Sequence, residues 1–135
     1  MNDTFTLHLQ SATQYERIEG VRSFVGEDPT GRFGILGGHE PLLTALIFGL
    51  CRYQVDSQPW MFVALPGGVL FMRDNQLMIN TRRYLSNTDF EVISEELGSR
   101  LLAEEQELQS VKKSLQQMEE QMLKHLWDLR RQGEY

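Results

Sequence analysis

The sequence is poor in cysteine, in long apolar runs and in positive charge. Cys51 is the one cysteine among 135 residues, so no internal disulfide can form. Its flanks carry no metal-ligand spacing, which predicts a buried, inert thiol in a reducing compartment. No run reaches the roughly 18 apolar residues that cross a bilayer, and no signal-peptide pattern opens the chain. We therefore expect a chain that neither enters a membrane nor is secreted by its own sequence. A net charge of -6 argues against nucleic acid as a partner, because its phosphates call for clustered lysine and arginine.

Catalytic and metal-binding motifs are also missing. The chain contains no G-x-S-x-G elbow, Walker loop, H-E-x-x-H or C-x-x-C pattern. Its histidines, His8, His39 and His125, are far apart and lack metal-ligand spacing. Paired acids such as Glu95-Glu96 are typical of the solvated face of a long helix. The sequence therefore predicts no catalytic, cofactor-binding or metal-binding residues.

Composition divides the chain in two. All four prolines and nine of the eleven glycines lie before residue 69. Residues 1–88 carry eight acids and seven bases, a net charge of -1, whereas residues 89–135 carry eleven acids and six bases, a net charge of -5. A shift of this kind marks a change of architecture. We predict an α+β protein with one domain over residues 1–86 and a helical C-terminal domain over residues 87–135.

The first half has the pattern of an antiparallel β-sandwich. Phe5, Leu7 and Leu9 alternate with polar residues, which is the period of a half-buried strand. Turn signals then recur about every 8–12 residues between short apolar runs. The run from Trp60 to Leu65 is almost wholly apolar, as in a strand buried on both faces. The run from Pro41 to Phe48 is expected to form a tight bend or a short strand.

The second half has the pattern of helix. Thr88 and Glu91 fit a capping box, which predicts a helix start at Thr88. Apolar residues then repeat at heptad spacing, as in a coiled-coil seam: Leu97, Leu101, Leu108, Val111, Leu115, Met118, Met122 and Leu129. No proline interrupts residues 89–131, so the tail forms one long helix or a two-helix hairpin, and the pattern does not choose between them. Such a seam needs a partner surface, because an amphipathic helix is stabilised mainly by packing its apolar face.

One stretch resembles a known family. Residues 31–46 read GRFGILGGHEPLLTAL, similar to the G-x-x-G-I-L-P-G-H-x-P-L-L-T signature of the epsilon subunit of F-type (rotary) ATP synthases. Residues 63–70 (VALPGGVL) resemble the family's next apolar strand and glycine pair, and residues 77–81 and 88–90 fit its last strand and the start of its helical tail. The resemblance thus covers nearly the whole chain in the same order.

This resemblance implies a non-catalytic rotor subunit of the central stalk. It would bind the gamma subunit and the membrane c-ring, couple ion flow to ATP synthesis and hydrolysis, and meet the membrane only through the complex. The implied location is the cytoplasmic face of a bacterial or archaeal inner membrane, or its organellar equivalent. The turn and the loop near the signature are expected to form one ring-facing end. The interface candidates there are Glu27, Asp28, Gly31, Arg32, Phe33, Gly38, His39 and Glu40.

The tail departs from the family pattern. After Asp89 it lacks the arginine and alanine of the D-x-x-R-A motif with which some relatives bind ATP, so no nucleotide is expected. The resemblance implies a regulatory contact of the helix with the catalytic α/β hexamer. An excess of acids in the tail favours weak or no inhibition. The basic residues available for that contact are Lys112, Lys113, Lys124, Arg130 and Arg131.

Two other functions fit parts of the sequence. A free-standing scaffold could dimerise through the coiled-coil seam, and would then be a homodimer without affinity for gamma. An enzyme or small-ligand carrier could be built on a β-barrel, and would then show a pocket with convergent polar groups.

Overall fold

The computed structural model describes residues 4–133 and divides the chain into two compact units. The first unit ends at Leu102, and the second begins at Ala103. Nine strands occur among the described residues: β1 (Phe5–Gln10), β2 (Tyr15–Asp28), β3 (Gly31–Leu36), β4 (Leu42–Leu46), β5 (Gly49–Val55), β6 (Met61–Leu65), β7 (Gly68–Arg73), β8 (Gln76–Asn80) and β9 (Leu85–Asn87).

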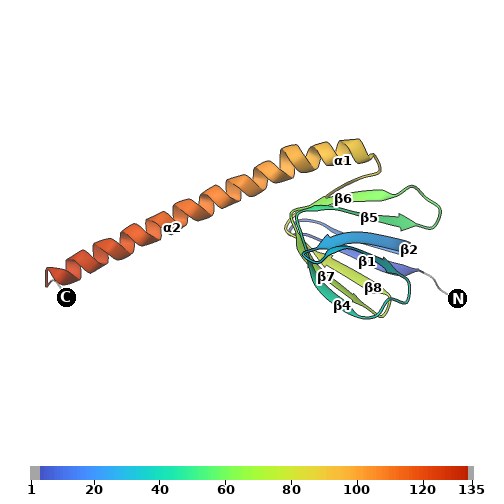
Figure 1. Cartoon of the computed structure of the whole chain (residues 1–135), viewed down its shortest axis with the longest axis horizontal. Helices are drawn as coiled ribbons and strands as arrows, with labels where there is room; N and C mark the ends of the chain where they lie inside the picture. The colour runs from blue at the N-terminus through green and yellow to red at the C-terminus, as the bar shows by residue number, and fades with distance from the viewer. Residues whose placement is uncertain (1–3, 134–135) are drawn as a thin grey trace. The chain divides into compact units, whose positions relative to one another are not determined.

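The strands form two layers that share β2. Hydrogen bonding follows the order β4-β7-β8-β1-β2-β5-β6-β9, with β3 also paired to β2 (Figure 1). Neighbours pair antiparallel except β1 and β8, which are parallel. The first part of β2 pairs with β1 and the second part with β3 and β5, and the register shifts where the two parts meet. Gly20 lies just before that point with φ of 72°, a backbone conformation that glycine adopts without steric cost.

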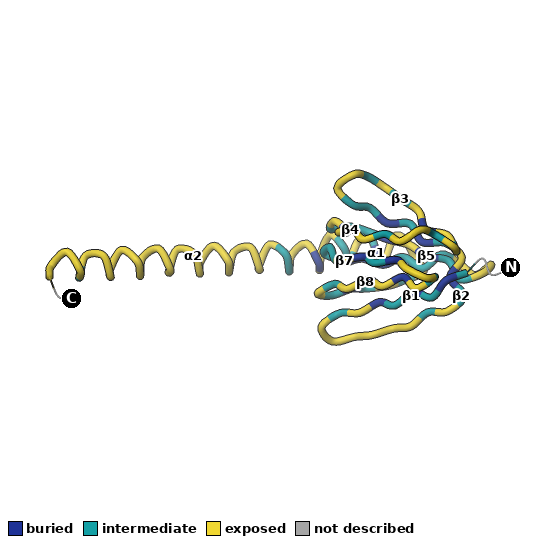
Figure 2. Tube along the Cα trace, turned by 90° about the horizontal axis from the view of Figure 1, so that it is seen from below, coloured by how far each residue is buried: buried dark blue, intermediate teal, exposed yellow. Residues whose placement is uncertain are grey.

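The core lies between the two layers. Alternate residues of each strand are buried, as in β1, where Phe5, Leu7 and Leu9 are at most 2% exposed. The same cluster takes in Phe24 of β2 and Ile35 of β3. Figure 2 shows the alternation of buried and exposed positions along the strands. The predicted β-sandwich is therefore confirmed, and the run after Pro41 is the strand β4.

The tail is helical without a break from Phe90 to Arg131. Helix α1 (Phe90–Glu96) continues through a π-helical segment, η1 (Leu97–Leu101), into α2 (Leu102–Arg131). The helix is therefore single, and the hairpin alternative is wrong. Within residues 4–133 no helix combines the length and apolar character needed to span a membrane.

The N-cap lies one residue later than the capping-box pattern indicates. Asp89, not Thr88, is the N-cap: its backbone is extended, and its Oδ1 accepts hydrogen bonds from the amides of Glu91 (3.0 Å) and Val92 (3.3 Å). A carboxylate at this position satisfies two free amides and also opposes the positive end of the helix dipole. The expected cap at Thr88 is wrong for that reason.

Strand β6 is buried on both faces, as its composition predicts. Val63 and Leu65 face the sandwich core, while Ala64 faces outward and is fully buried beneath Ile93 of α1 and Leu101 of η1. The first compact unit therefore extends past the end of the last strand and takes in α1 and η1. Strand gives way to helix between Asn87 and Phe90, and the expected domain limit at residue 86 stays a prediction.

This packing predicts different effects for two truncations. A chain ending after Leu102 keeps Ile93 and Leu101 in place and should unfold at nearly the temperature of the full chain. A chain ending after Thr88 loses both side chains, and its free energy of unfolding should fall by about 3–6 kcal/mol, the transfer free energy of two buried aliphatic side chains. Thermal and urea unfolding of the two truncated chains would measure the difference. Equal stabilities would show that α1 and η1 contribute nothing to the sandwich.

Candidate subunit interface

An apolar surface covers the outer face of strands β4, β7 and β8. Leu43, Phe71 and Met78 are direct cross-strand neighbours, and Ala45 and Val69 form the adjacent row. Leu43 is 68% exposed, Val69 51% and Met78 40%. Side chains in such rows lie about 5 Å apart and form a continuous patch. We call these five residues the apolar face.

Polar groups border the apolar face on its β1 side. His8, the partner of Met78 across the parallel pair, has both ring nitrogens in hydrogen bonds. Its Nδ1 lies 2.7 Å from the Tyr15 hydroxyl, and its Nε2 lies 2.7 Å from Gln76 Oε1. The imidazole also stacks on the Tyr15 ring, with the ring centroids 6.0 Å apart. This hydrogen-bonded border holds the side chains beside the apolar face in one arrangement.

The opposite outer face of the sandwich is occupied by α1 (Figure 1). The Phe62 ring of β6 meets Phe90 of α1 edge to face, with centroids 5.3 Å apart. On the neighbouring strand β5, Arg52 is the cross-strand partner of Phe62, and its guanidinium lies over the Trp60 ring, 4.8 Å from the ring centroid. Helix α1 thus covers one outer face of the sandwich. Within the described part of the first unit, the apolar face is a large apolar surface that no helix covers.

The turn between β2 and β3 holds the first group of sequence-predicted residues. Asp28 Oδ1 accepts from the Thr30 amide at 2.9 Å, and its Oδ2 accepts from the Thr44 hydroxyl at 2.7 Å, which joins the turn to β4. The Thr30 hydroxyl also donates to Asp28 Oδ1. The hydrogen bonds from the two hydroxyls, with that of Thr30 having the larger effect, hold the pKa of Asp28 below its usual value of 3.8. Gly31 has φ of 125°, so a side chain there would be strained.

Three further predicted residues, Glu27, Arg32 and Phe33, lie on the strands beside this turn. Glu27 and Arg32 are cross-strand partners in the β2–β3 hairpin. Phe33 is half-buried and packs against Phe24 of the core, with ring centroids 6.4 Å apart. Phe33 therefore stabilises the hairpin, whereas Arg32 is exposed to solvent.

The second group lies in the loop between β3 and β4. The Gly38 amide donates to Asn75 Oδ1 at 2.7 Å, which ties this loop to the β7–β8 turn. The Nδ1 of His39 lies 2.6 Å from the carbonyl oxygen of Glu40, and the His39 amide donates to the Leu36 carbonyl. Gly38 has a φ of 77°, which favours glycine. A side chain there would have room, so the backbone conformation and not crowding accounts for the glycine.

The structure does not bring the two groups together. The turn precedes β3 and the loop follows it, and six residues of extended strand separate them by about 20 Å. The expectation of one shared contact end is wrong, because β3 runs the length of its layer between them. The turn lies beside the end of β4, where the Ile47 amide bonds to the Glu27 carbonyl, and the loop lies beside the β7–β8 turn.

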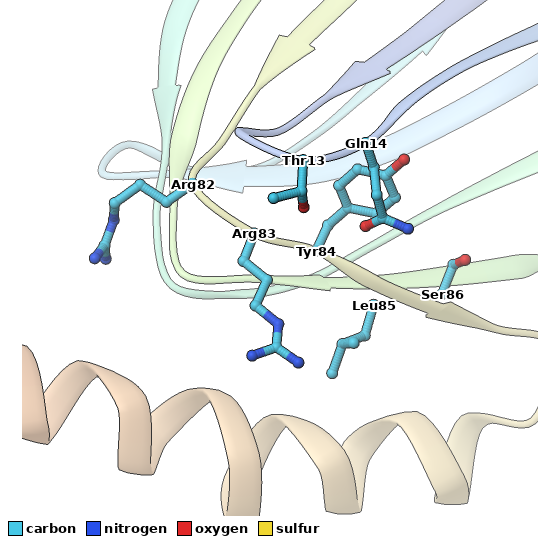
Figure 3. Close-up of a pocket in the computed structure, with 7 residues that line it drawn as sticks. All are labelled: Thr13, Gln14, Arg82, Arg83, Tyr84, Leu85 and Ser86. Atoms are coloured by element: carbon cyan, nitrogen blue, oxygen red, sulfur yellow. The ribbon is translucent and has the colours of Figure 1, made fainter.

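A polar recess of about 600 Å³ lies between the β1–β2 turn and residues 82–86. Its side chains point in different directions (Figure 3): Tyr84 extends toward Gln14, while Arg83 and Leu85 extend the other way. The Tyr84 hydroxyl donates to Glu16 at 2.8 Å, and burial together with this bond raises the pKa of Tyr84. Among the described residues, no group of three His, Cys, Asp or Glu side chains could hold a metal ion.

Cys51 is buried, as predicted. It is 4% exposed in the sandwich core and carries a free thiol. Burial, with a smaller effect of the Glu27 charge, raises the pKa of the Cys51 thiol to about 12. The thiol is therefore protonated at neutral pH and is a poor nucleophile.

The basic residues of the tail lie on different sides of α2. At 100° per residue, Lys113, Lys124 and Arg131 share one stripe, and Lys112 and Arg130 share another. All five are exposed. Their assignment to a regulatory contact stays a prediction.

Comparison with known proteins identifies the family. Residues 4–86 match the β-sandwich domain of the ATP synthase delta/epsilon chain. The chain therefore belongs to the ATP synthase delta/epsilon family.

Members of the delta/epsilon family from bacteria and chloroplasts are similar in sequence. The chain is 46% identical over 52 residues to "ATP synthase epsilon chain 2" of Cereibacter sphaeroides, an alignment that covers 38% of this chain and 36% of the relative. It is 46% identical over 76 residues to the chloroplastic epsilon chain of Zygnema circumcarinatum, with 56% of each chain covered. The matches thus span between about a third and just over half of these relatives' length.

Two solved structures share the fold. One is from the Euglena gracilis mitochondrial ATP synthase, described as OSCP/F1/c-ring, with a TM-score of 0.58 at 19% identity over 70% of this chain and 61% of that chain. The other is from the Tetrahymena thermophila mitochondrial ATP synthase, described as central stalk/c-ring, with a TM-score of 0.51 at 15% identity over 59% of this chain and 64% of that chain.

The apolar face is the feature that sequence reasoning did not locate. The run from Val69 to Met72 contains more apolar residues than a half-buried strand needs, and that excess was the available signal. Pairing in the structure shows that Leu70 and Met72 face the core, whereas Val69 and Phe71 face outward. Which strands would place Leu43 and Met78 beside them depends on non-local pairing, which the pattern does not contain.

The hydrogen bonds of Asp28 predict a pH-dependent contribution to stability. Because its folded pKa is depressed, Asp28 stabilises the fold above its unfolded pKa and loses this effect as pH falls through the folded value. We expect Asp28→Asn to lower the melting temperature near neutral pH, and the difference from wild type to shrink below about pH 3. Melting curves from about pH 2.5 to 7 would test this. A difference that stays constant across the range would contradict the assigned role.

Proposed function

We propose that the chain is the epsilon subunit of an F-type ATP synthase and serves as a non-catalytic part of its central stalk. The observation that carries the proposal is the exposed apolar face. It lies on the sandwich domain, which is the part of the chain that matches the delta/epsilon family. Exposed apolar patches of this kind mark interaction sites, because leaving them in water has a cost that a partner removes. A stalk subunit needs a stiff core and two contact surfaces, and no reacting groups.

The apolar face is proposed to bind the gamma subunit. Leu43, Phe71 and Met78 form its central row, and the hydrogen-bonded His8 borders it. The His39 loop is proposed to belong to the same contact. It leads directly into β4, which carries Leu43, and Gly38 is hydrogen-bonded to the turn that joins β7 and β8. Gly38, His39 and Glu40 would then lie at the edge of the gamma interface.

The β2–β3 turn is proposed to contact the c-ring. Glu27, Asp28, Gly31 and Arg32 form a compact, charged turn that is braced from β4 through the Asp28–Thr44 hydrogen bond. A braced turn at one end of a sandwich suits contact with polar loops, because it resists deformation under load. The two structural neighbours come from assemblies whose descriptions name the c-ring, which supports a place in such a complex. The chain would then meet the membrane only through the ring, on the side that carries the catalytic hexamer.

A pair of charge variants tests the gamma contact. Leu43 of β4 and Val92 of α1 are 68% and 40% exposed, and they lie on opposite sides of the sandwich. Leu43→Asp places a charge in the apolar face and should weaken gamma binding by at least about tenfold, or 1.4 kcal/mol. Val92→Asp places the same charge on the helix-covered side and should leave binding unchanged. Calorimetric titration of gamma with each variant is the measurement.

Melting temperatures of both variants control for folding. Both side chains are exposed, and an aspartate in the first turn of a helix is favourable, so each substitution should change stability little. If Val92→Asp weakens gamma binding as much as Leu43→Asp, the contact lies elsewhere. If the wild-type chain itself does not bind gamma, the stalk assignment is wrong.

A further inference from the structure

Helix α2 carries an apolar stripe of the width used in coiled coils. Leu108, Val111, Leu115, Met118 and Met122 follow one another at spacings of three and four residues, and they are between 41% and 64% exposed. We call these five residues the seam. Between residues 108 and 122 the apolar side chains are confined to these heptad positions. Such a stripe is narrower than the face a helix buries on a sheet, so its fitting partner is another α-helix.

The charges beside the seam favour a second copy of the same helix. In a parallel, in-register pair, Glu107 of one copy lies beside Lys112 of the other, and the symmetry gives this attraction twice. The next flanking pairs are Ser114 with Glu119 and Gln121 with Leu126. No pair along the seam opposes two like charges.

Antiparallel pairing fits less well. Placing Leu115 against Met118 of an antiparallel copy sets Leu108 against His125, so one seam residue of each copy loses its apolar partner. The flanking pairs are then Glu107 with Asp128, which repel each other, and Lys112 with Glu119, which attract each other, so the edge charges give no net preference for this pair. The seam is bounded by Glu104 and His125, which occupy the heptad positions on either side of it, so pairing is limited to about four turns of helix.

We propose that the free chain associates with a second copy of itself through a parallel coiled coil of α2, with residues 108–122 as the seam and Glu107–Lys112 pairs as its edges. This dimer would form when the chain is free of any complex, so the proposal does not depend on the proposed place in the stalk. A seam of two heptads gives a weak, concentration-dependent dimer. Binding of α2 by another helix would compete with it.

Sedimentation equilibrium of the full chain tests the proposal without any partner subunit. From about 5 to about 500 μM, the mass should rise from 15.7 kDa toward twice that value. Lys112→Glu and Glu107→Lys should each raise the dissociation constant by about tenfold, because each turns two attractions into two repulsions. The double variant with both exchanges should restore dimerisation. Lys113→Glu makes the same charge change one residue away, on the side of the helix opposite the seam, and should have little effect.

Each alternative gives a distinct result. A mass of 15.7 kDa at every concentration would overturn the proposal and leave the seam to a different partner. Tighter association of Glu107→Lys would indicate the antiparallel pair, and the proposed orientation would be wrong. Equal weakening by Lys113→Glu and Lys112→Glu, or no recovery in the double variant, would show that the flanking pairs do not form. Circular dichroism of each variant should show unchanged helix content, which separates loss of pairing from loss of folding.

Discussion

The burial of β6 on both of its faces determines how the rest of the sandwich is used. Val63 and Leu65 fill the core between the layers, and Ala64 on the other side is sealed by Ile93 and Leu101. Helix α1 and segment η1 are therefore part of the folded unit, although they follow the last strand. Because they cover the outer face of the β5–β6–β9 side, the outer face of β4, β7 and β8 is left for another molecule.

The same arrangement separates the two proposed contact regions. The loop with His39 adjoins the apolar face through Gly38 and Asn75, whereas the turn with Asp28 lies at the other end of β3 and is braced from β4. The proposed stalk role needs contacts at separate points on one stiff body. The hydrogen bonds that tie both segments to strands of the sandwich provide that stiffness, and the core between the layers resists deformation because it is close-packed.

Local patterns in the sequence predict the elements well, since strand alternation and heptad spacing depend on residues close together in the chain. Phe5, Leu7 and Leu9 are buried as their alternation predicts, and the apolar run of β6 correctly indicates a strand buried twice. Features that depend on the pairing of strands far apart in the sequence could not be predicted. The apolar face exists because β4 pairs with β7 and β7 with β8, and the separation of Asp28 from His39 follows from the direction of β3. The choice of Asp89 over Thr88 as N-cap was a competition between neighbours that the capping-box pattern does not resolve.

The proposed binding of gamma by the apolar face can be tested through the chain's own methionines. Met78 lies in the apolar face and is 40% exposed, Met72 of the neighbouring strand is fully buried, and Met118 and Met122 of α2 are exposed. Oxidation by peroxide follows exposure, so in the free chain Met78 should react while Met72 does not. In a complex with gamma, formed and purified before peroxide is added, peptide mass spectrometry should show Met78 protected by at least about fivefold. Oxidation of Met78 at the free-chain rate within that complex would contradict the account.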